Sequence, residues 1–168
     1  MSKFQAYGKE ELRNRSLFSL RLEHVQDLSH LVDFPSHHFV CLIAWDSSKS
    51  SVEEISLLAK RLLDEGAAYV CTWGEDCERV HDIFDEVLVM RGIDSGKEGN
   101  LIMTTWHSDE ELFEAIYFAL ADSGLPDCFE CDSDAILGIS IGSKFWAEEI
   151  HSTFSRPNEF RRSFLGYP

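Results

Sequence analysis

The sequence predicts an α/β fold: one three-layer domain with a mostly parallel sheet of four to five strands and helices on both faces, flavodoxin-like or Rossmann-like. Two observations support this prediction. Three apolar, β-branched runs each end in tryptophan, and each is followed by a polar segment and a helical pattern. Strand–helix units recur at intervals of about 30 residues, which is typical of parallel strands joined by crossover helices.

Residues 1–36 are expected to form an N-terminal arm or an added strand or helix. Residues 18–22 alternate between apolar and polar side chains, as in a half-buried strand. The apolar spacing of residues 25–32 fits an amphipathic helix nearly as well. The sequence therefore leaves strand and helix both open for residues 17–32.

The first strand–helix unit begins with the run Phe39–Trp45. The helix after it is expected to start at a Ser50 or Ser51 N-cap, with Glu53 or Glu54 completing a capping box. An apolar stripe along the following turns would face the sheet.

The second and third units repeat this pattern. Strand Ala68–Trp73 leads to a helix from about Glu75. Strand Asn100–Trp106 leads to a helix for which Ser108 is the expected N-cap.

A fourth strand, Ala135–Ile141, leads into a last helix. Pro157 ends that helix and leaves residues 157–168 as a tail. No long linker or low-complexity segment interrupts the chain, so we expect a single domain over residues 1–168.

The charge is unevenly distributed. The net charge is −15, and residues 98–143 contain no lysine or arginine but ten acidic residues. Such a surface can simply keep the protein soluble. It can also attract a basic protein partner, and it makes nucleic-acid binding unfavourable.

We expect this stretch to form an acidic face on the third helix and the loop after it. Acidic side chains at a helix start are favoured by the helix dipole in any case. The candidate partner-binding residues are Glu110, Glu111, Glu114, Asp122, Asp127, Asp132 and Asp134.

The strand ends predict a second candidate site. The carboxyl ends of parallel strands share one edge of the sheet, and ligands of open α/β sheets bind there. The three tryptophans and their neighbours would then line one crevice. Its predicted residues are Trp45, Asp46, Trp73, Gly74, Trp106, His107 and Ser143.

Four residues are catalytic candidates if the protein is an enzyme. Cys77 and His81 are one helical turn apart and could form a nucleophile–base pair, although Cys77 also fits the apolar stripe. His107 could act as a general acid or base, or it could cap the next helix or bond to a neighbouring loop. Asp46 completes the candidates.

Cys128 and Cys131 form a Cys-x-x-Cys motif in an acidic loop. A zinc ribbon needs a second such pair, which the chain lacks. A thioredoxin-type pair should open a helix, and this one precedes a strand. We therefore expect neither a metal nor a cofactor, and these two cysteines are weak metal candidates.

Composition indicates a cytoplasmic protein. No apolar run approaches the roughly 20 residues of a membrane span, and the N-terminus does not have the pattern of a signal peptide. Five cysteines, some inside expected core strands, suit reduced thiols. Homo-oligomerisation stays open.

Residues 73–82, Trp-Gly-Glu-Asp-Cys-Glu-Arg-Val-His-Asp, and residues 103–107, Met-Thr-Thr-Trp-His, resemble motifs of a bacterial family of unknown function with a small α/β domain. The likeness covers about residues 38–120. It implies a bacterial cytoplasmic protein and no particular activity.

Two functions of different class remain. The first is a non-catalytic protein that binds a partner protein in an immunity-like or regulatory role. Small acidic bacterial proteins include immunity proteins that neutralise basic toxins, and this analogy suggests the role. The second is a small-molecule sensor or enzyme that uses the crevice. The sequence favours the first, because no recognised catalytic set is present.

Overall fold

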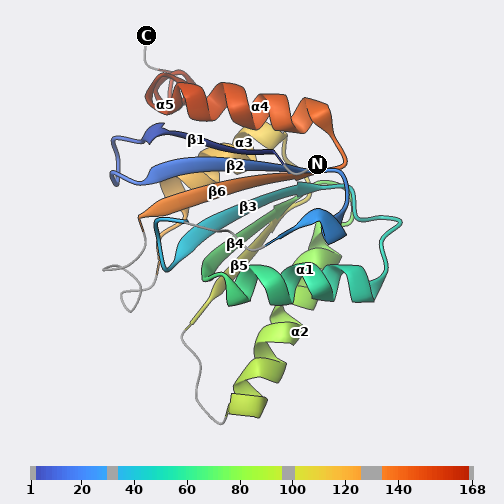
Figure 1. The fold of residues 1–168 in the computed structure, drawn as a ribbon. Helices are drawn as coiled ribbons and strands as arrows, with labels where there is room; N and C mark the ends of the chain where they lie inside the picture. Colours follow the sequence, from blue (N-terminus) through green and yellow to red (C-terminus); the bar gives the residue numbers. More distant parts are fainter. Residues whose placement is uncertain (1–2, 30–33, 96–100, 126–133, 167–168) are drawn as a thin grey trace.

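The computed structural model describes residues 3–29, 34–95, 101–125 and 134–166, which form a six-stranded sheet with helices on both faces (Figure 1). The strands are β1 (Lys3–Lys9), β2 (Ser16–Leu22), β3 (Phe39–Trp45), β4 (Ala67–Trp73), β5 (Met103–His107) and β6 (Ala135–Ile141). The helices are η1 (Val25–Asp27), α1 (Val52–Asp64), α2 (Cys77–Ser95), α3 (Leu112–Tyr117), η2 (Phe118–Asp122), α4 (Lys144–Ser155) and α5 (Pro157–Phe164). The predicted α/β class with a mostly parallel sheet is confirmed, with six strands in place of four to five.

The strand order is β1-β2-β6-β3-β4-β5, with β1 antiparallel to β2 and all other neighbours parallel. The last strand, β6, therefore lies between β2 and β3. From β3 the chain passes to α1 on one face of the sheet, and from β6 it passes to α4 on the other. Ligands of open α/β sheets bind where two such connections diverge, so the fold itself points to the ends of β3 and β6.

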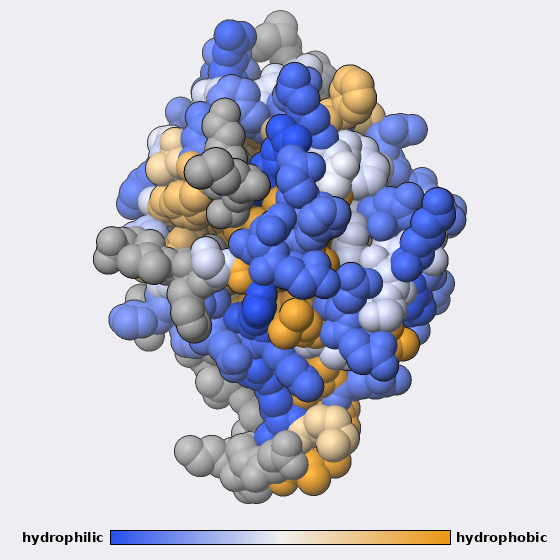
Figure 2. Space-filling view, turned by 45° about the vertical axis from the view of Figure 1, so that its right-hand side comes forward, coloured by the Kyte–Doolittle hydropathy of each residue, from blue (hydrophilic) through white to orange (hydrophobic). Residues whose placement is uncertain are grey.

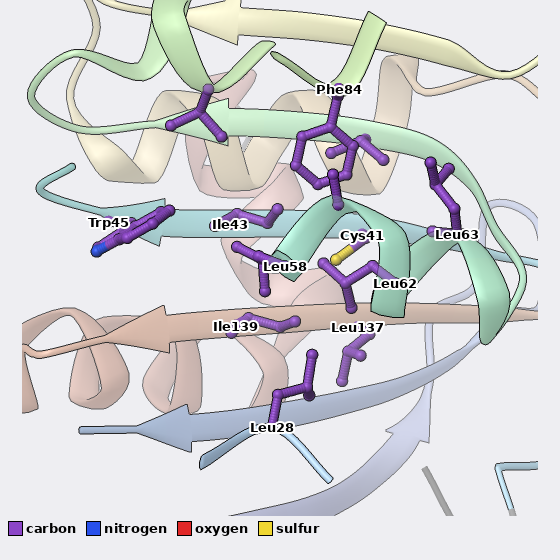
Figure 3. Packing of buried hydrophobic residues seen from close by; sticks show 14 of the residues in the cluster. Leu28, Cys41, Ile43, Trp45, Leu58, Leu62, Leu63, Phe84, Leu137 and Ile139 are labelled. Atoms are coloured by element: carbon purple, nitrogen blue, oxygen red, sulfur yellow. The ribbon is translucent and has the colours of Figure 1, made fainter. Parts of the chain in front are cut away.

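Each face of the sheet carries its own hydrophobic cluster. β3 is buried along its whole length, because α1 and α2 cover one face and α3 and α4 cover the other. Figure 3 shows Leu58 and Leu62 of α1 pointing toward Ile43 of β3 and Ile139 of β6. A side chain of this size contributes about 1.5–3 kcal/mol by leaving water, and these contacts hold α1 against the sheet.

Residues 17–29 form the strand β2 and the short helix η1. Residues 17–22 form a strand and not a helix because both faces of β2 pack against apolar side chains. Leu17 faces the cluster under α4, and Phe18 and Leu20 face the cluster under α1. The polar N-terminal segment forms β1, an edge strand, where a charged side chain such as that of Lys9 discourages pairing with another chain.

A buried ion pair ties the β1–β2 turn to the end of η2. Arg15 Nε lies 3.1 Å from Glu10 Oε1, and each side chain is 4% exposed. Arg15 Nη2 also donates to the carbonyl oxygen of Leu120 at 2.8 Å. Burial lowers the pKa of Arg15, and the Glu10 carboxylate opposes that shift. A guanidinium thus satisfies a carbonyl at a helix end that would otherwise lack a partner.

The helix ends differ in how well the sequence predicted them. Ser51 and Glu54 cap each other as expected: Ser51 Oγ accepts from Glu54 N at 3.2 Å, and Glu54 Oε2 accepts from Ser51 N at 3.0 Å. The third helix begins later than expected, with Glu111 rather than Ser108 as its N-cap. Residues 157–164 form α5 instead of a tail, since a proline is well suited to the first position of a helix.

Candidate functional site

A cleft of about 310 Å³ lies where the carboxyl ends of β2, β6 and β3 meet the first turns of α1 and α4. We call it the switch-point cleft. Figure 2 turns this side of the molecule forward and shows a largely hydrophilic face with apolar atoms between the polar ones. The cleft is lined by Glu23, His24, Val25, Gln26, Trp45, Asp46, Ser50, Glu54, Ile141, Gly142 and Trp146.

Two of its three carboxylates are held by hydrogen bonds from neighbouring polar groups. Asp46 Oδ1 accepts from the backbone N of Ser48 at 3.1 Å and from its hydroxyl at 2.6 Å, and these bonds lower the pKa of Asp46. Bonds from Ser51 N and from Gln26 Nε2, each 3.0 Å, lower the pKa of Glu54. Both groups are therefore negatively charged at neutral pH.

The third carboxylate, Glu23, is paired with Arg21 Nη2 on the rim of the cleft. The residues that line the cleft include three acids and one histidine but no lysine or arginine. Arg21 already compensates Glu23, so Asp46 and Glu54 supply the negative charge that a cationic group would meet in the cleft.

Trp45 supplies an aromatic wall and a hydrogen-bond donor. Its side chain is only 6% exposed, yet its indole N–H makes no hydrogen bond to another residue in the part of the chain that the structure describes. Figure 3 shows the indole at the end of β3 with its nitrogen directed away from the core. This donor belongs to a residue that lines the cleft, so it is available to a ligand.

Trp146 forms the opposite aromatic wall from the first turn of α4. Its ring packs edge-to-face on Trp73, with centroids 5.4 Å apart. Trp73 is fixed in turn, because its Nε1 donates to the carbonyl oxygen of Glu110 at 2.8 Å. The side chain of Ser143 caps α4 by accepting from Trp146 N at 3.4 Å. Trp146 is thus held in place from two sides.

A glycine turn joins the two strands at the cleft floor. Gly142 has a φ of +75°, a conformation that residues with a Cβ rarely adopt. This turn lets its N–H donate to the carbonyl oxygen of Leu22 at 2.9 Å. The end of β2 is thereby fastened to the end of β6, which places Glu23 and His24 at the cleft.

The three predicted tryptophans share the carboxyl edge but lie on alternate faces of the sheet. Trp45 belongs to the cluster under α1 and α2, whereas Trp73 packs on the cluster under α3 and α4. Trp106 is 46% exposed, and its ring is tilted against that of His81, with centroids 4.6 Å apart. The three tryptophans therefore do not line one crevice. Of the predicted crevice residues, only Trp45 and Asp46 line the switch-point cleft.

His107 lies within β5 rather than in the loop after it, and it is 5% exposed. Its Nδ1 is 2.8 Å from Glu110 Oε2, its Nε2 is 3.2 Å from Thr105 Oγ1, and its ring contacts Phe118. Both ring nitrogens are thus engaged by neighbours. This geometry matches the structural alternative, in which the histidine bonds to a neighbouring loop.

Cys77 and His81 are not arranged as a reactive pair. Cys77 is fully buried, and burial raises the pKa of its thiol, which keeps the thiol protonated at neutral pH. His81 faces Asp82 and Asp85 instead, with nitrogen–oxygen distances of 3.1 and 3.6 Å. Asp46, the fourth candidate, lines the switch-point cleft.

The predicted acidic face is described only in part. Glu110, Glu111, Asp122 and Asp134 are exposed, and Glu114 is half-buried because its carboxylate accepts from Glu111 N at 2.8 Å. Asp127 and Asp132 lie outside the described residues, as do Cys128 and Cys131. Glu110 is engaged by His107, so the freely exposed charges of this face are fewer than the sequence suggested.

Sequence reasoning missed the residues that the β2 loop and the two helices bring to the cleft. Glu23 and His24 follow an apolar strand directly, which is the same pattern that drew attention to the tryptophans. The pattern could not be used for Glu23 and His24, because the sequence leaves strand and helix both open for residues 17–32. Glu54 was predicted only as a capping residue and Trp146 carried no signal of its own, since strand order decides which helix starts lie side by side.

No group of three or more His, Cys, Asp or Glu side chains in residues 3–29, 34–95, 101–125 and 134–166 is placed to hold a metal ion. No helix within the same ranges is long and apolar enough to cross a membrane.

Comparison with known proteins identifies the family but no activity. Residues 17–157 match the model of a family described as a domain of unknown function (DUF7684). The chain belongs to this family. The matched segment runs from β2 to the start of α5 and includes every residue that lines the switch-point cleft, while β1 lies before it. No curated protein matches the sequence.

Proposed function

We propose that this DUF7684 protein is a non-catalytic binding protein whose switch-point cleft receives a lysine or arginine side chain of a basic partner protein. Binding of a basic partner protein is consistent with a regulatory or immunity-like role. The observation that carries the proposal is the composition of the cleft, with two tryptophans and three carboxylates but no lysine or arginine.

The chemistry of the cleft suits a cation for two reasons. A cation over a tryptophan face gains about 0.5–2 kcal/mol, the larger value where water is excluded. The carboxylates of Asp46 and Glu54 are already positioned by their hydrogen bonds, so a bound cation need not order them. A guanidinium or ammonium group would thus meet both an aromatic surface and fixed negative charge.

The charge of the whole chain supports a macromolecular partner. A net charge of −15 attracts a basic protein over a distance of several ångströms and speeds its approach at low salt. Glu111 and Asp122 lie on the exposed surface of the third helix region and add to this field. Specificity would then come from the cleft and association speed from the surface.

A small-molecule sensor for an organic amine is the second candidate. The cleft volume of about 310 Å³ is at the lower end of the range for ligand pockets, roughly 300–1,000 Å³. The unbonded N–H of Trp45 favours this alternative, because a free ligand can carry a hydrogen-bond acceptor that a lysine side chain lacks.

Binding of two probes separates these candidates. The full chain is titrated with an arginine-rich peptide and with arginine methyl ester, and binding is followed by tryptophan fluorescence and calorimetry. The proposal expects the peptide to bind, Asp46→Asn and Glu54→Gln each to weaken it by about tenfold, or ~1.4 kcal/mol, and Glu53→Gln to change nothing. Glu53 is the matched control, because it is the exposed neighbour of Glu54 on α1 and does not line the cleft.

Three outcomes are informative. Equal effects of Glu53→Gln and Glu54→Gln would show that the peptide responds to overall charge and not to the cleft. Binding of the ester alone, weakened by Trp45→Phe, would favour the amine sensor. Binding of neither probe would overturn both candidates.

A further inference from the structure

A second cavity has Arg21 in its lining, whereas Glu23, the ion-pair partner of Arg21, lines the switch-point cleft. It has a volume of about 190 Å³ and lies between β1, β2 and α4. Figure 1 shows α4 running along these two strands. We call this cavity the Arg21 pocket, lined by Gln5, Tyr7, Ser19, Arg21, Lys144 and His151 among others. A single water needs only about 10–15 Å³, so the Arg21 pocket has room for a small organic or inorganic group.

The guanidinium of Arg21 has an unmet hydrogen-bonding requirement at this pocket. Its Nη2 donates to Glu23, but its Nε is buried and has no hydrogen-bond partner. Within the described part of the chain, this is the one side-chain nitrogen or oxygen atom that is itself closed to solvent and has no partner. The Nε is closed to solvent in this arrangement, but the Arg21 side chain is about one-third exposed, so a small turn of the guanidinium would offer its unbonded N–H to an acceptor in the pocket.

Hydroxyl groups line the same cavity. The hydroxyl oxygen of Tyr7 lies 2.9 Å from Ser19 Oγ and 3.0 Å from His151 Nδ1. When His151 donates from Nδ1, Tyr7 can donate to Ser19, and the Ser19 hydroxyl hydrogen is left for a ligand. Burial raises the pKa of Tyr7, so its phenol keeps its proton at neutral pH and the chain of donors stays intact.

Lys144 lies at the start of α4 and adds a mobile positive charge. Its Nζ is 3.2 Å from Glu148 Oε1, and both side chains are mostly exposed. An exposed pair of this kind holds its partners weakly, so Lys144 can turn toward a ligand in the pocket. Glu148 and Glu23 are the carboxylates that oppose an anion here.

We propose that the Arg21 pocket binds a small oxyanion, the carboxylate or phosphate group of a ligand. Arginine recognises both groups through its N–H donors, and the Ser19 hydroxyl and the Lys144 ammonium would complete the contacts. The residues that line this pocket do not line the switch-point cleft, so the two sites can be tested separately.

The test uses the ¹⁵N-labelled full chain, titrated with sodium acetate and, separately, with sodium phosphate at constant ionic strength. We expect saturable shifts of the amides of Ser19, Arg21 and Lys144 with at least one anion. The acetate arm identifies a carboxylate site and the phosphate arm a phosphate site. Arg21→Gln should reduce the affinity at least tenfold, whereas Arg162→Gln, which changes an exposed arginine of α5, should not.

Two further variants make the result decisive. Glu23→Gln should tighten anion binding severalfold, because it removes the carboxylate that competes for Arg21. Lys144→Gln changes a mostly exposed side chain, so it should fold normally and weaken binding severalfold even if Arg21→Gln does not fold. The proposal is overturned if the amide shifts rise linearly without saturation for both anions. It is also overturned if neither Arg21→Gln nor Lys144→Gln changes the affinity.

Discussion

Gly74 packs against the main chain of Trp45, and this contact sets the geometry of the cleft wall. Gly74 has a φ of +115°, and a Cβ at this position would overlap the carbonyl oxygen of Trp45. The turn after β4 can therefore approach the end of β3 only because residue 74 has no side chain. Trp45, with its unbonded indole N–H, is held at the carboxyl edge by this approach.

Replacing Gly74 by alanine should destabilise the fold and distort the cleft. The added Cβ forces an unfavourable φ and displaces the Trp45 carbonyl, and strain of this kind costs about 1–3 kcal/mol. Gly92→Ala is the matched control, because a Cβ on Gly92 in α2 meets nothing within 4 Å. It should stabilise the helix by about 0.5–1 kcal/mol. Urea unfolding of both variants measures the difference, and an equal effect of the two substitutions contradicts the prediction.

The buried pair of Arg15 and Glu10 predicts a large effect of removing one partner. Glu10→Gln leaves the Arg15 guanidinium charged and buried, which costs about 3–5 kcal/mol. The exposed pair of Arg162 and Glu11 is the control, and Glu11→Gln should change the free energy of unfolding by about 0–1 kcal/mol. Chemical denaturation of the two variants at pH 7 provides the comparison. A Glu10→Gln variant as stable as the unmodified chain means that the pair is not needed to hold the β1–β2 turn.

The buried strands were the part of the fold that the sequence predicted best. The expected bounds of β3 and β6 coincide with the observed ones, because both strands are apolar on both faces and end at polar residues. β1 could not be recognised, since an edge strand needs no apolar pattern and its pairing with β2 is made by main-chain atoms. α5 was not predicted, because a proline can end one helix and can equally occupy the first position of the next.

The switch-point cleft lies at the same edge of the sheet as the predicted crevice, and the two sets of residues share only Trp45 and Asp46. The apolar runs indicate that the strands end together, and Trp45 and Asp46 were found in this way. The sequence does not give the strand order, and β6 inserts between β2 and β3 through contacts between distant segments. Glu23 lines the same cleft as Trp45 only because of this strand order, so no local pattern could have predicted it, whereas Glu54 comes from α1, the helix that follows β3 in the chain.

Cys71 should make the fold sensitive to alkali. Burial raises the pKa of its thiol from 9.0 to about 12, and burial also raises the pKa of Cys41. Between pH 9 and about pH 12 the unfolded chain loses the Cys71 proton and the folded chain keeps it. The free energy of unfolding therefore falls as the pH rises above 9. The contribution of Cys71 is a loss of about 1.4 kcal/mol between pH 8 and pH 10.

Urea unfolding at the two pH values tests this dependence. Cys71→Ala is expected to be less stable at pH 8 because it leaves a small cavity, but its stability should fall less steeply toward pH 10. The difference between the two slopes, and not the stability itself, measures the thiol. Parallel slopes for the variant and the unmodified chain would mean that Cys71 titrates normally.

If the acidic surface sets the association rate and the switch-point cleft holds the bound partner, substitutions at the two places should change different rate constants. Charge reversal at Glu111 and Asp122 should slow association with the arginine-rich peptide and flatten its salt dependence, because these exposed side chains act through the long-range field. Asp46→Asn should instead speed dissociation, because it removes a contact made only in the bound state.

Stopped-flow fluorescence at several salt concentrations separates the two rates. His107→Ala and Cys77→Ala should leave both rates unchanged at a temperature where the variants are folded, since neither residue lines the cleft. The prediction is wrong if charge reversal changes dissociation while Asp46→Asn does not. In that case the partner contacts the third helix directly, and the acidic surface, not the switch-point cleft, is the binding site.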